Sequence, residues 1–420
     1  MHLKFAKTAA RTVALGALAV GAGVGAAQTA LAAPVSGAVD VSCSAAALAS
    51  DISGNTGGET LSLAKFCVYQ LPAALPHITE DLTIDGGTIE RSYATGTPDF
   101  SLLKVKADAS LVLNDVNLRN GGGADTEYGG AIDNEDGSVT VNGGTLSDNV
   151  SYYEGGAISN EASLTVNGAS LTGGSSEYGG AIYNEDDGSV TVTGSAFSGN
   201  SATDRGGAIY NDSDMTVAHS SFTGNAAGDQ GGGGVFNGED ADLTVTGSGF
   251  DQNQAANGGG IASEGDLTLT GGGFIGNAAE DGGGGGITNS GQATVNGATF
   301  RQNTASLNGG GIANKLNLTV DGGTFTSDTA ASDGGGLYND GVAAVAGATF
   351  RQSHAEYGGG IYSDYQAAVT DSLIVGNTAT SGGGGIYSDD DGTVTLTNSS
   401  VMGNHPDNCE PLNSISGCTD

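Results

Sequence analysis

The sequence predicts an all-β fold: a single-stranded right-handed parallel β-helix with three short strands in each coil of about 25 residues. One observation is a repeat that aligns on an aliphatic position at intervals of 24 to 27 residues. Another is the regular placement of glycine, which makes up 76 of 420 residues. The aligned aliphatic residues are Ile132, Ile158, Ile182, Ile209, Val235, Ile261, Ile287, Ile312, Leu337, Ile361 and Ile386.

The repeat at residues 206–225, GGAIYNDSDMTVAHSSFTGN, shows how one coil divides into strands. Met215 and Val217 flank Thr216, and Phe222 follows after a short polar turn. Alternation by two is the pattern of a strand, and parallel crossovers are almost always right-handed. No segment offers ten residues with helical periodicity, so we expect no helix. A sandwich or propeller would require hairpin signals, which are missing.

The first 32 residues have the pattern of a secretory signal peptide. Lys4, Lys7 and Arg11 precede an apolar run, and Ala30 and Ala32 supply the small residues of a cleavage site. We therefore expect an extracellular protein, released or loosely associated with the cell wall, and no other segment predicts a membrane span.

The rest of the chain divides into two caps and the coils between them. The coils start before the first aligned isoleucine, because LTIDGGTIERS at 82–92 resembles LTVDGGTFTSD at 318–328. The predicted segments are a signal peptide (1–32), an N-terminal cap (33–77), the β-helix (78–404) and a C-terminal cap (405–420).

The charge of the chain excludes some partners. Residues 33–420 contain all 47 acidic residues but only nine of the twelve Lys and Arg, so their formal charge is −38. Nucleic acid and anionic lipid are therefore poor partners. Cations, basic proteins and uncharged surfaces remain.

Residue types recur at fixed positions because each coil position stacks on itself. The aligned aliphatic residues predict one inward column, and a second consists of Phe197, Phe222, Phe250, Phe274, Phe300, Phe325 and Phe350. A polar ladder at a turn is predicted for Asn134, Asn160, Asn184, Asn211, Asn237, Asn289, Asn314 and Asn339, with Ser263, Ser363 and Ser388 in the remaining coils. These columns are expected to be structural.

The four cysteines lie outside the regular repeats. Cys43 and Cys67 come before them, and Cys409 and Cys418 come after them. Four cysteines allow three pairings, but distance along the stack favours 43 with 67 and 409 with 418. We expect two disulfides that close the caps, where exposed strand edges would otherwise invite aggregation. A zinc site is the alternative, although no CxxC motif or paired histidines support it.

The repeats resemble a known family. GGAI at 129, 155, 179 and 206, with FSGN (197), FTGN (222), FDQN (250), FIGN (274) and FRQN (300), is similar to the GGA[ILV] and FxxN repeats of the chlamydial polymorphic outer membrane proteins. The chain also resembles secreted β-helix repeat proteins of actinobacteria. The resemblance implies adhesion as a function. The chlamydial proteins end in a transmembrane β-barrel, and we expect none here.

Enzymatic activity is the alternative, because polysaccharide lyases and glycosidases also use this fold. Paired carboxylates do not discriminate, since neighbouring coils place any acidic column, such as Glu135, Glu161 and Glu185, at about 4.8 Å intervals. Repeats of 24 to 27 residues leave no room for long loops that build a cleft. Arg301 and Arg351 are isolated from each other. We therefore expect no enzyme.

Two outward columns have simple explanations. The acids Asp186, Asp212, Asp240, Asp340, Asp364, Asp389 and Asp390 follow the GGAI strand and offer calcium ligands between coils, but we favour a solvated acidic face and predict no cofactor. The threonines Thr140, Thr165, Thr191, Thr216, Thr244, Thr268, Thr294 and Thr319 resemble an ice-binding array, yet strand propensity explains them.

The third outward column is aromatic and gives the candidate binding site. It consists of Tyr183, Tyr210 and Phe236, then small residues, then Tyr338, Tyr362 and Tyr387. Rings at these intervals can stack against sugars or contact a basic partner. The hypothesis is thus a monomeric, non-catalytic, adhesin-like protein that binds a glycan or another cell-surface component. A purely structural rod is the remaining alternative, because stacked rings also stabilise neighbouring strands.

Overall fold

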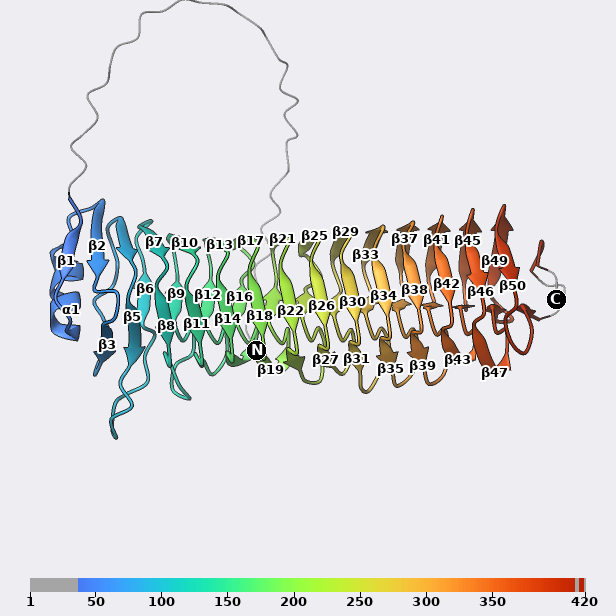
Figure 1. Cartoon of the computed structure of the whole chain (residues 1–420), viewed down its shortest axis with the longest axis horizontal. Coiled ribbons are helices and arrows are strands. Elements are labelled where there is room, and N and C mark those ends of the chain that lie inside the picture. Colours follow the sequence, from blue (N-terminus) through green and yellow to red (C-terminus); the bar gives the residue numbers. More distant parts are fainter. Residues whose placement is uncertain (1–36, 412–414, 419–420) are drawn as a thin grey trace, which may run out of the picture. The chain divides into compact units, whose positions relative to one another are not determined.

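The computed structural model describes residues 37–411 and 415–418. The predicted signal peptide, residues 1–32, lies outside the described residues. The described residues form one compact unit of stacked parallel strands, which confirms the predicted all-β solenoid. Figure 1 shows the coils following one another in chain order from β1 to β50.

Three long parallel sheets run along the stack, one strand of each per coil. The first has 15 strands, from β1 (Val39–Val41) and β2 (Glu59–Leu63) to β49 (Thr393–Thr397). The second has 14, from β3 (Val68–Leu71) and β5 (Thr88–Arg91) to β50 (Ser400–Met402). The third has 13 three-residue or two-residue strands, and its outer face carries the candidate site.

The third sheet begins after the first coils and ends in the C-terminal cap. Its strands are β6 (Leu103–Val105), β9 (Ile132–Asn134), β12 (Ile158–Asn160), β16 (Ile182–Asn184), β20 (Ile209–Asn211), β24 (Val235–Asn237), β28 (Ile261–Ser263), β32 (Ile287–Asn289), β36 (Ile312–Asn314), β40 (Leu337–Asn339), β44 (Ile361–Ser363), β48 (Ile386–Ser388) and β51 (Cys409–Glu410).

A fourth sheet of nine strands adds to the three that the sequence predicts in each coil. It lies in the link between the second and third sheets and starts at β15. Its strands are β15 (Ser175–Tyr178), β19 (Ser201–Arg205), β23 (Ala226–Ala227), β27 (Gln254–Ala255), β31 (Ala278–Ala279), β35 (Thr304–Ala305), β39 (Thr329–Ala330), β43 (His354–Tyr357) and β47 (Thr378–Gly382).

The two apolar columns predicted from the sequence fill the interior. The aligned aliphatic residues are buried and pair in register along the third sheet, as Ile182 with Ile209. The seven phenylalanines are also buried, and their rings stack face to face with centroids 4.4–4.9 Å apart. Leu171 and Ile374 continue this column on either side. Both predicted columns are therefore confirmed.

The predicted asparagine ladder is also confirmed. From Asn134 to Asn237 and from Asn289 to Asn339, each Nδ2 donates to the next Oδ1 over 2.7–2.9 Å. Ser263 and Ser363 accept from the asparagine before them through Oγ, at 3.2 and 3.1 Å. The amides also bond the turn, as Asn211 Nδ2 does to Ser213 O at 2.6 Å. The ladder thus satisfies most of its buried amides, but it is interrupted after Ser263, where the buried Oδ1 of Asn289 has no partner among the described residues.

A second ladder, not predicted, is formed by the last residue of the FxxN motif. Its members are Asn200, Asn225, Asn253, Asn277, Asn303, Asp328, Ser353, Asn377 and Asn404. Each asparagine donates Nδ2 both to the side chain of the next coil and to a carbonyl of the preceding coil, as Asn253 does to Asn277 Oδ1 and Phe222 O, each at 3.0 Å. The motif therefore has a structural origin.

The glycine before each aliphatic residue permits a tight turn. Gly206 has φ +68°, and a Cβ there would lie 2.3 Å from Ile209 O. An alanine at this position would therefore strain the backbone, and its Cβ would clash with the carbonyl oxygen of Ile209.

The N-terminal cap contains the one helix in the described part of the chain, α1 (Ala45–Gly54). The expectation of no helix is wrong here. Ser44 caps α1 by accepting from Ala47 N at 3.1 Å, and Leu48 and Ile52, four residues apart, are buried. The pair Cys43–Cys67 is bonded as predicted. Within residues 33–77, β1 already pairs with β2, while β2 and β3 pair with β4 (Leu82–Asp85) and β5 of the next coil.

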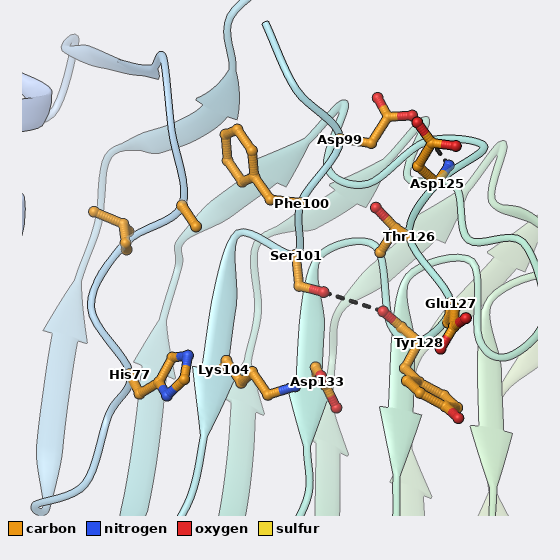
Figure 2. A pocket seen from close by; sticks show the side chains of 12 residues that line it. His77, Asp99, Phe100, Ser101, Lys104, Asp125, Thr126, Glu127, Tyr128 and Asp133 are labelled. Carbon is orange, nitrogen blue, oxygen red and sulfur yellow. Dashed lines mark hydrogen bonds and ion pairs between the residues drawn. The ribbon is translucent and has the colours of Figure 1, made fainter.

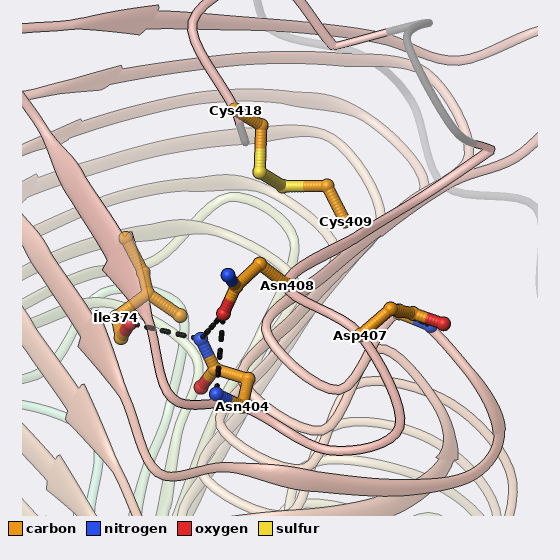
Figure 3. Close-up of a disulfide and its surroundings, with 7 residues drawn as sticks. Ile374, Asn404, Asp407, Asn408, Cys409 and Cys418 are labelled. Atoms are coloured by element: carbon orange, nitrogen blue, oxygen red, sulfur yellow. Dashed lines mark hydrogen bonds between the residues drawn. A yellow bond between two sulfur atoms is a disulfide. The ribbon is translucent and has the colours of Figure 1, made fainter. Parts of the chain in front are cut away.

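The second disulfide, Cys409–Cys418, is also confirmed (Figure 3). Beside it, Asn404 ends the second ladder by donating Nδ2 to Ile374 O at 3.0 Å and to Asn408 Oδ1 at 3.1 Å. The C-terminal cap therefore supplies the partners that a further coil would have provided.

Candidate functional site

The middle residue of each strand in the third sheet points outward, between two inward residues. Register places these outward residues in one column: Lys104, Asp133, Ser159, Tyr183, Tyr210, Phe236, Ala262, Thr288, Ala313, Tyr338, Tyr362, Tyr387 and Glu410. All six aromatic residues predicted as binding residues lie in it. The column also contains, at its start, the charged pair Lys104 and Asp133, which the sequence reasoning missed.

The first aromatic ribbon consists of Tyr183, Tyr210 and Phe236. Tyr183 and Tyr210 stack with centroids 4.9 Å apart, and Tyr210 and Phe236 at 5.2 Å. The fourth sheet covers this ribbon: Tyr178 packs edge-on at 5.7 Å from Tyr210, and the Arg205 guanidinium lies 4.8 Å above Phe236. Phe236 is only 1% exposed. The first ribbon therefore offers little ring surface to a partner.

The second aromatic ribbon consists of Tyr338, Tyr362 and Tyr387. Their rings stack with centroids 5.4 and 5.3 Å apart and interplanar angles of 18° and 6°. Tyr338 and Tyr387 are partly exposed, whereas Tyr362 is 8% exposed. Tyr357 packs edge-on against Tyr387 at 5.1 Å. The second ribbon thus presents more ring surface than the first.

The phenols of the second ribbon stay neutral beside a carboxylate rim. Burial, with the charges of Asp340 and Asp364, raises the pKa of Tyr338 to about 12. Burial also raises the pKa of Tyr362, whose hydroxyl donates to Asp389 Oδ2 at 3.0 Å. Neutral hydroxyls, flat rings and carboxylate acceptors side by side are groups that can contact the hydroxyls and C–H faces of a sugar.

The gap between the ribbons is hollowed. Phe236, Ala262 and Thr288 line a hollow of about 130 Å³ together with Lys315. Thr288 Oγ1 donates to Gly283 O at 2.6 Å, so its hydroxyl is held in place. The small residues that the sequence placed between the ribbons therefore make a recess on the same face.

A larger cleft lies at the start of the outward column (Figure 2). It has a volume of about 410 Å³ and is lined by Ala74, Leu75, His77, Asp99, Phe100, Ser101, Lys104, Asp125, Thr126, Glu127, Tyr128 and Asp133. The expectation that the repeats leave no cleft rested on coils from Ile132 onward. The cleft lies in earlier coils, which that alignment did not reach.

Lys104 and Asp133, which line this cleft, belong to an ion-pair network. Lys104 Nζ lies 2.6 Å from Asp133 Oδ2 and 2.5 Å from Glu135 Oε1, and Lys106 Nζ lies 2.7 Å from Glu135 Oε2. Burial raises the pKa of Asp133 despite the opposing Lys104. Burial would also lower the pKa of Lys104, but its hydrogen bonds to Asp133 and Glu135 outweigh it and the pKa is raised. The ammonium group of Lys104 is therefore already paired with the carboxylates of Asp133 and Glu135.

The predicted acidic column forms a separate hollow. Glu135, Glu161 and Glu185 each follow a ladder asparagine, and they line a space of about 420 Å³ with further acids. Burial and the Glu185 charge raise the pKa of Glu161 to about 7. Burial, then a hydrogen bond with Glu185, raises the pKa of Glu154 well above 4.5. Crowded carboxylates here share protons instead of all ionising.

A calcium site between coils was the less favoured alternative for the outward column of aspartates. Across residues 37–411 and 415–418, no group of three or more His, Cys, Asp and Glu is arranged to hold a metal ion. The described residues also contain no helix with the length and apolar character needed to span a bilayer.

Fold and repeats together define the chain as a β-solenoid repeat protein. Residues 194–212 and 371–389 each match the family model of the Chlamydia polymorphic membrane protein (Chlamydia_PMP) repeat. Both matches run from a strand of the second sheet to one of the third, through β20 and β48. This confirms the resemblance seen in the sequence, and it fits a surface or adhesin-like repeat protein. No curated protein and no solved structure matches the chain.

Proposed function

We propose that the protein is a secreted or surface-associated, non-catalytic adhesin that recognises a glycan through the second aromatic ribbon, Tyr338, Tyr362 and Tyr387. The observation that carries the proposal is the difference in cover between the two ribbons. The fourth sheet packs a tyrosine edge-on against each ribbon, Tyr178 and Tyr357, but only the first ribbon is also covered by Arg205. The first ribbon has one partly exposed ring, Tyr183, whereas the second has two, Tyr338 and Tyr387, beside carboxylates.

The spacing and chemistry of this surface suit a polysaccharide. Ring centroids 5.3 and 5.4 Å apart make a continuous row of ring edges and phenol hydroxyls that can contact successive sugar units. The rim acids, including Asp340 and Asp364, accept hydrogen bonds from sugar hydroxyls. The two disulfides and the repeat family support an extracellular location.

The test is a glycan panel scored for binding and for new reducing or unsaturated ends together. We expect the native protein to retain at least one glycan without cleaving it. The triple variant Tyr338→Ser, Tyr362→Ser, Tyr387→Ser should keep its circular dichroism spectrum and lose about tenfold or more in affinity, because ring contacts contribute about 1 kcal/mol each. The matched control changes Tyr152, Tyr153 and Tyr365, which are exposed and lie outside the column.

Two results would contradict the proposal. Unchanged attachment in the triple variant, with a lowered melting temperature, would make the ribbon purely structural. Cleavage of any glycan would favour the alternative function, a polysaccharide lyase or glycosidase on the same fold.

A further inference from the structure

The cleft at the start of the outward column owes its shape to links of unequal length. Six residues, 72–77, connect the end of β3 to the bridging residue Ile78. In the next coil eleven residues, 92–102, connect β5 to β6. Figure 1 shows the loop after β5 extending beyond those of neighbouring coils. The short link, 72–77, therefore forms the low wall of the cleft. The longer links, such as 92–102, form the high wall.

Hydrogen bonds hold the high wall in place. Arg91 Nη1 donates to Asp99 Oδ1 at 2.9 Å, and Asp125 N donates to Asp99 Oδ2 at 3.2 Å. Ser101 Oγ donates to Tyr128 O at 3.1 Å (Figure 2). The wall is thus organised before any ligand binds, which lowers the entropy cost of binding.

One polar group in the wall lacks a partner. Thr126 is 8% exposed, and its Oγ1 makes no hydrogen bond within the described part of the chain. Its backbone, in contrast, is bonded on both sides, to Gly123 O and from Tyr152 N. A buried hydroxyl without a partner is costly, so a ligand group that bonded Oγ1 would gain an interaction the free protein does not have.

The remaining groups define which ligand fits. Asp125 and Glu127 offer exposed carboxylate acceptors, and Phe100 and Tyr128 offer ring surface. Lys104 is already shared by two carboxylates, so an acidic ligand would have to compete with Asp133 and Glu135 for its ammonium group. A neutral sugar supplies hydroxyls that both donate and accept, and a C–H face for the rings. The volume of about 410 Å³ lies in the range of small-ligand sites.

We infer that this cleft is a second, separate binding site, and that it takes a non-acidic saccharide unit. Asp125 and Glu127 accept from the sugar hydroxyls, Thr126 Oγ1 bonds one of them, and Tyr128 or Phe100 covers the C–H face. The inference does not depend on the proposed role of the second ribbon, because the two sites share no residue.

The experiment is isothermal titration of the variant Tyr338→Ser, Tyr362→Ser, Tyr387→Ser, so that any remaining binding comes from elsewhere. The probes are cello-, malto-, manno- and chitotetraose, with trigalacturonate as the acidic comparison. We expect one of the neutral probes to bind. Adding Thr126→Val should weaken that binding about fivefold to tenfold, as loss of one hydrogen bond does. Thr126→Ser should restore it, and Thr140→Val, on the first sheet, should leave it unchanged.

Three results would overturn the inference: no neutral probe binds, trigalacturonate binds as tightly, or Thr126→Val has no effect while its melting temperature is unchanged. If Thr126→Val unfolds the protein, Glu127→Gln replaces it, and the same loss is expected because an exposed carboxylate acceptor is weakened. A negative result for this cleft would not contradict the proposed role of the second ribbon. A negative result for the ribbon would not contradict binding in this cleft.

Discussion

Two positions of the coil behave in opposite ways along the stack. The inward position of the second sheet holds phenylalanine in seven successive coils, from Phe197 to Phe350, with rings stacked at 4.4–4.9 Å. Over nearly the same coils the outward position of the third sheet changes from tyrosine to phenylalanine, alanine and threonine. An interior residue meets the same neighbours in every coil, so one residue type suits all coils. An outward residue lacks that constraint, so its variation indicates where something other than folding selects it.

The largest effect that tests this comparison is expected from Phe274→Ala. Phe274 is fully buried between Phe250 and Phe300, so the change removes two stacked contacts and leaves a cavity. We expect the free energy of unfolding to fall by about 4 kcal/mol. Tyr338→Ala, on the outer face, should lower the free energy of unfolding by only about 1 kcal/mol, the contribution of a cross-strand ring contact. Urea denaturation followed by circular dichroism and fluorescence measures both, and equal losses would remove the distinction between the two positions.

A gain of stability is expected from Asp328→Asn, within the second ladder. Asp328 Oδ1 accepts from Asn303 N and Nδ2 at 2.9 Å each, but its buried Oδ2 has no partner. In the preceding rung this position is an amide that donates to a carbonyl, as Asn303 Nδ2 does to Phe274 O at 3.0 Å. An amide at 328 would restore that bond.

The gain from Asp328→Asn should depend on pH. Burial raises the pKa of Asp328 from 3.8 to about 7, so its carboxyl is protonated in the fold and ionised in the unfolded chain between these values. The native protein therefore loses stability as pH rises from about 4 to 7, on the order of 4 kcal/mol in total. The variant should be more stable by that amount at pH 8 and nearly equal at pH 4, where the protonated carboxyl of Asp328 has an O–H that can donate in place of the amide. A pH-independent difference would contradict this account.

A smaller loss is expected from Asn211→Ala in the first ladder. Asn211 Nδ2 donates to Asn237 Oδ1 at 2.8 Å and to Ser213 O at 2.6 Å, and its Oδ1 accepts from Asn184. Alanine leaves these buried partners unpaired, which costs about 2 kcal/mol. Thr216→Ala, exposed on the first sheet, is the control and should cost about 0.5 kcal/mol. If the two losses matched, the ladder would carry no special stability.

The interior could be predicted from the sequence because its residues recur at fixed intervals. A residue such as Ile209 or Phe222 recurs at a fixed interval, and in a stacked coil a recurring position must face the same neighbours. The disulfide between Cys43 and Cys67 followed from distance along the stack. The second ladder had the same kind of signal in the FxxN motif, which was recognised as a family resemblance but not as a hydrogen-bonded column.

The features that escaped prediction are short or irregular. Five strands of the fourth sheet, such as β23, have only two residues, too few to show alternation. Helix α1 buries only Leu48 and Ile52, a pattern too brief to indicate a helix. The position of Arg205 above Phe236 depends on side-chain conformation across a link. The cleft lies in coils whose links differ in length, so the repeat interval does not predict which residues line it.

The smallest effect tests the charged part of the outer face, through Glu154→Gln. Burial and the facing carboxyl of Glu185 raise the pKa of Glu154, so the folded protein holds a proton there that the unfolded chain releases above pH 4.5. The native protein should thus lose stability as pH rises above this value. Because Glu154 is only partly buried, solvent screening limits the contribution to about 1 kcal/mol. Glutamine cannot ionise, so the variant should show a flatter dependence of unfolding free energy on pH between 5 and 8, measured in urea at fixed ionic strength. The matched control is Glu239→Gln, an exposed acid that should leave the slope unchanged. An identical slope in Glu154→Gln and the native protein would mean that these carboxylates ionise independently, and that this part of the outer face is an ordinary solvated acidic surface.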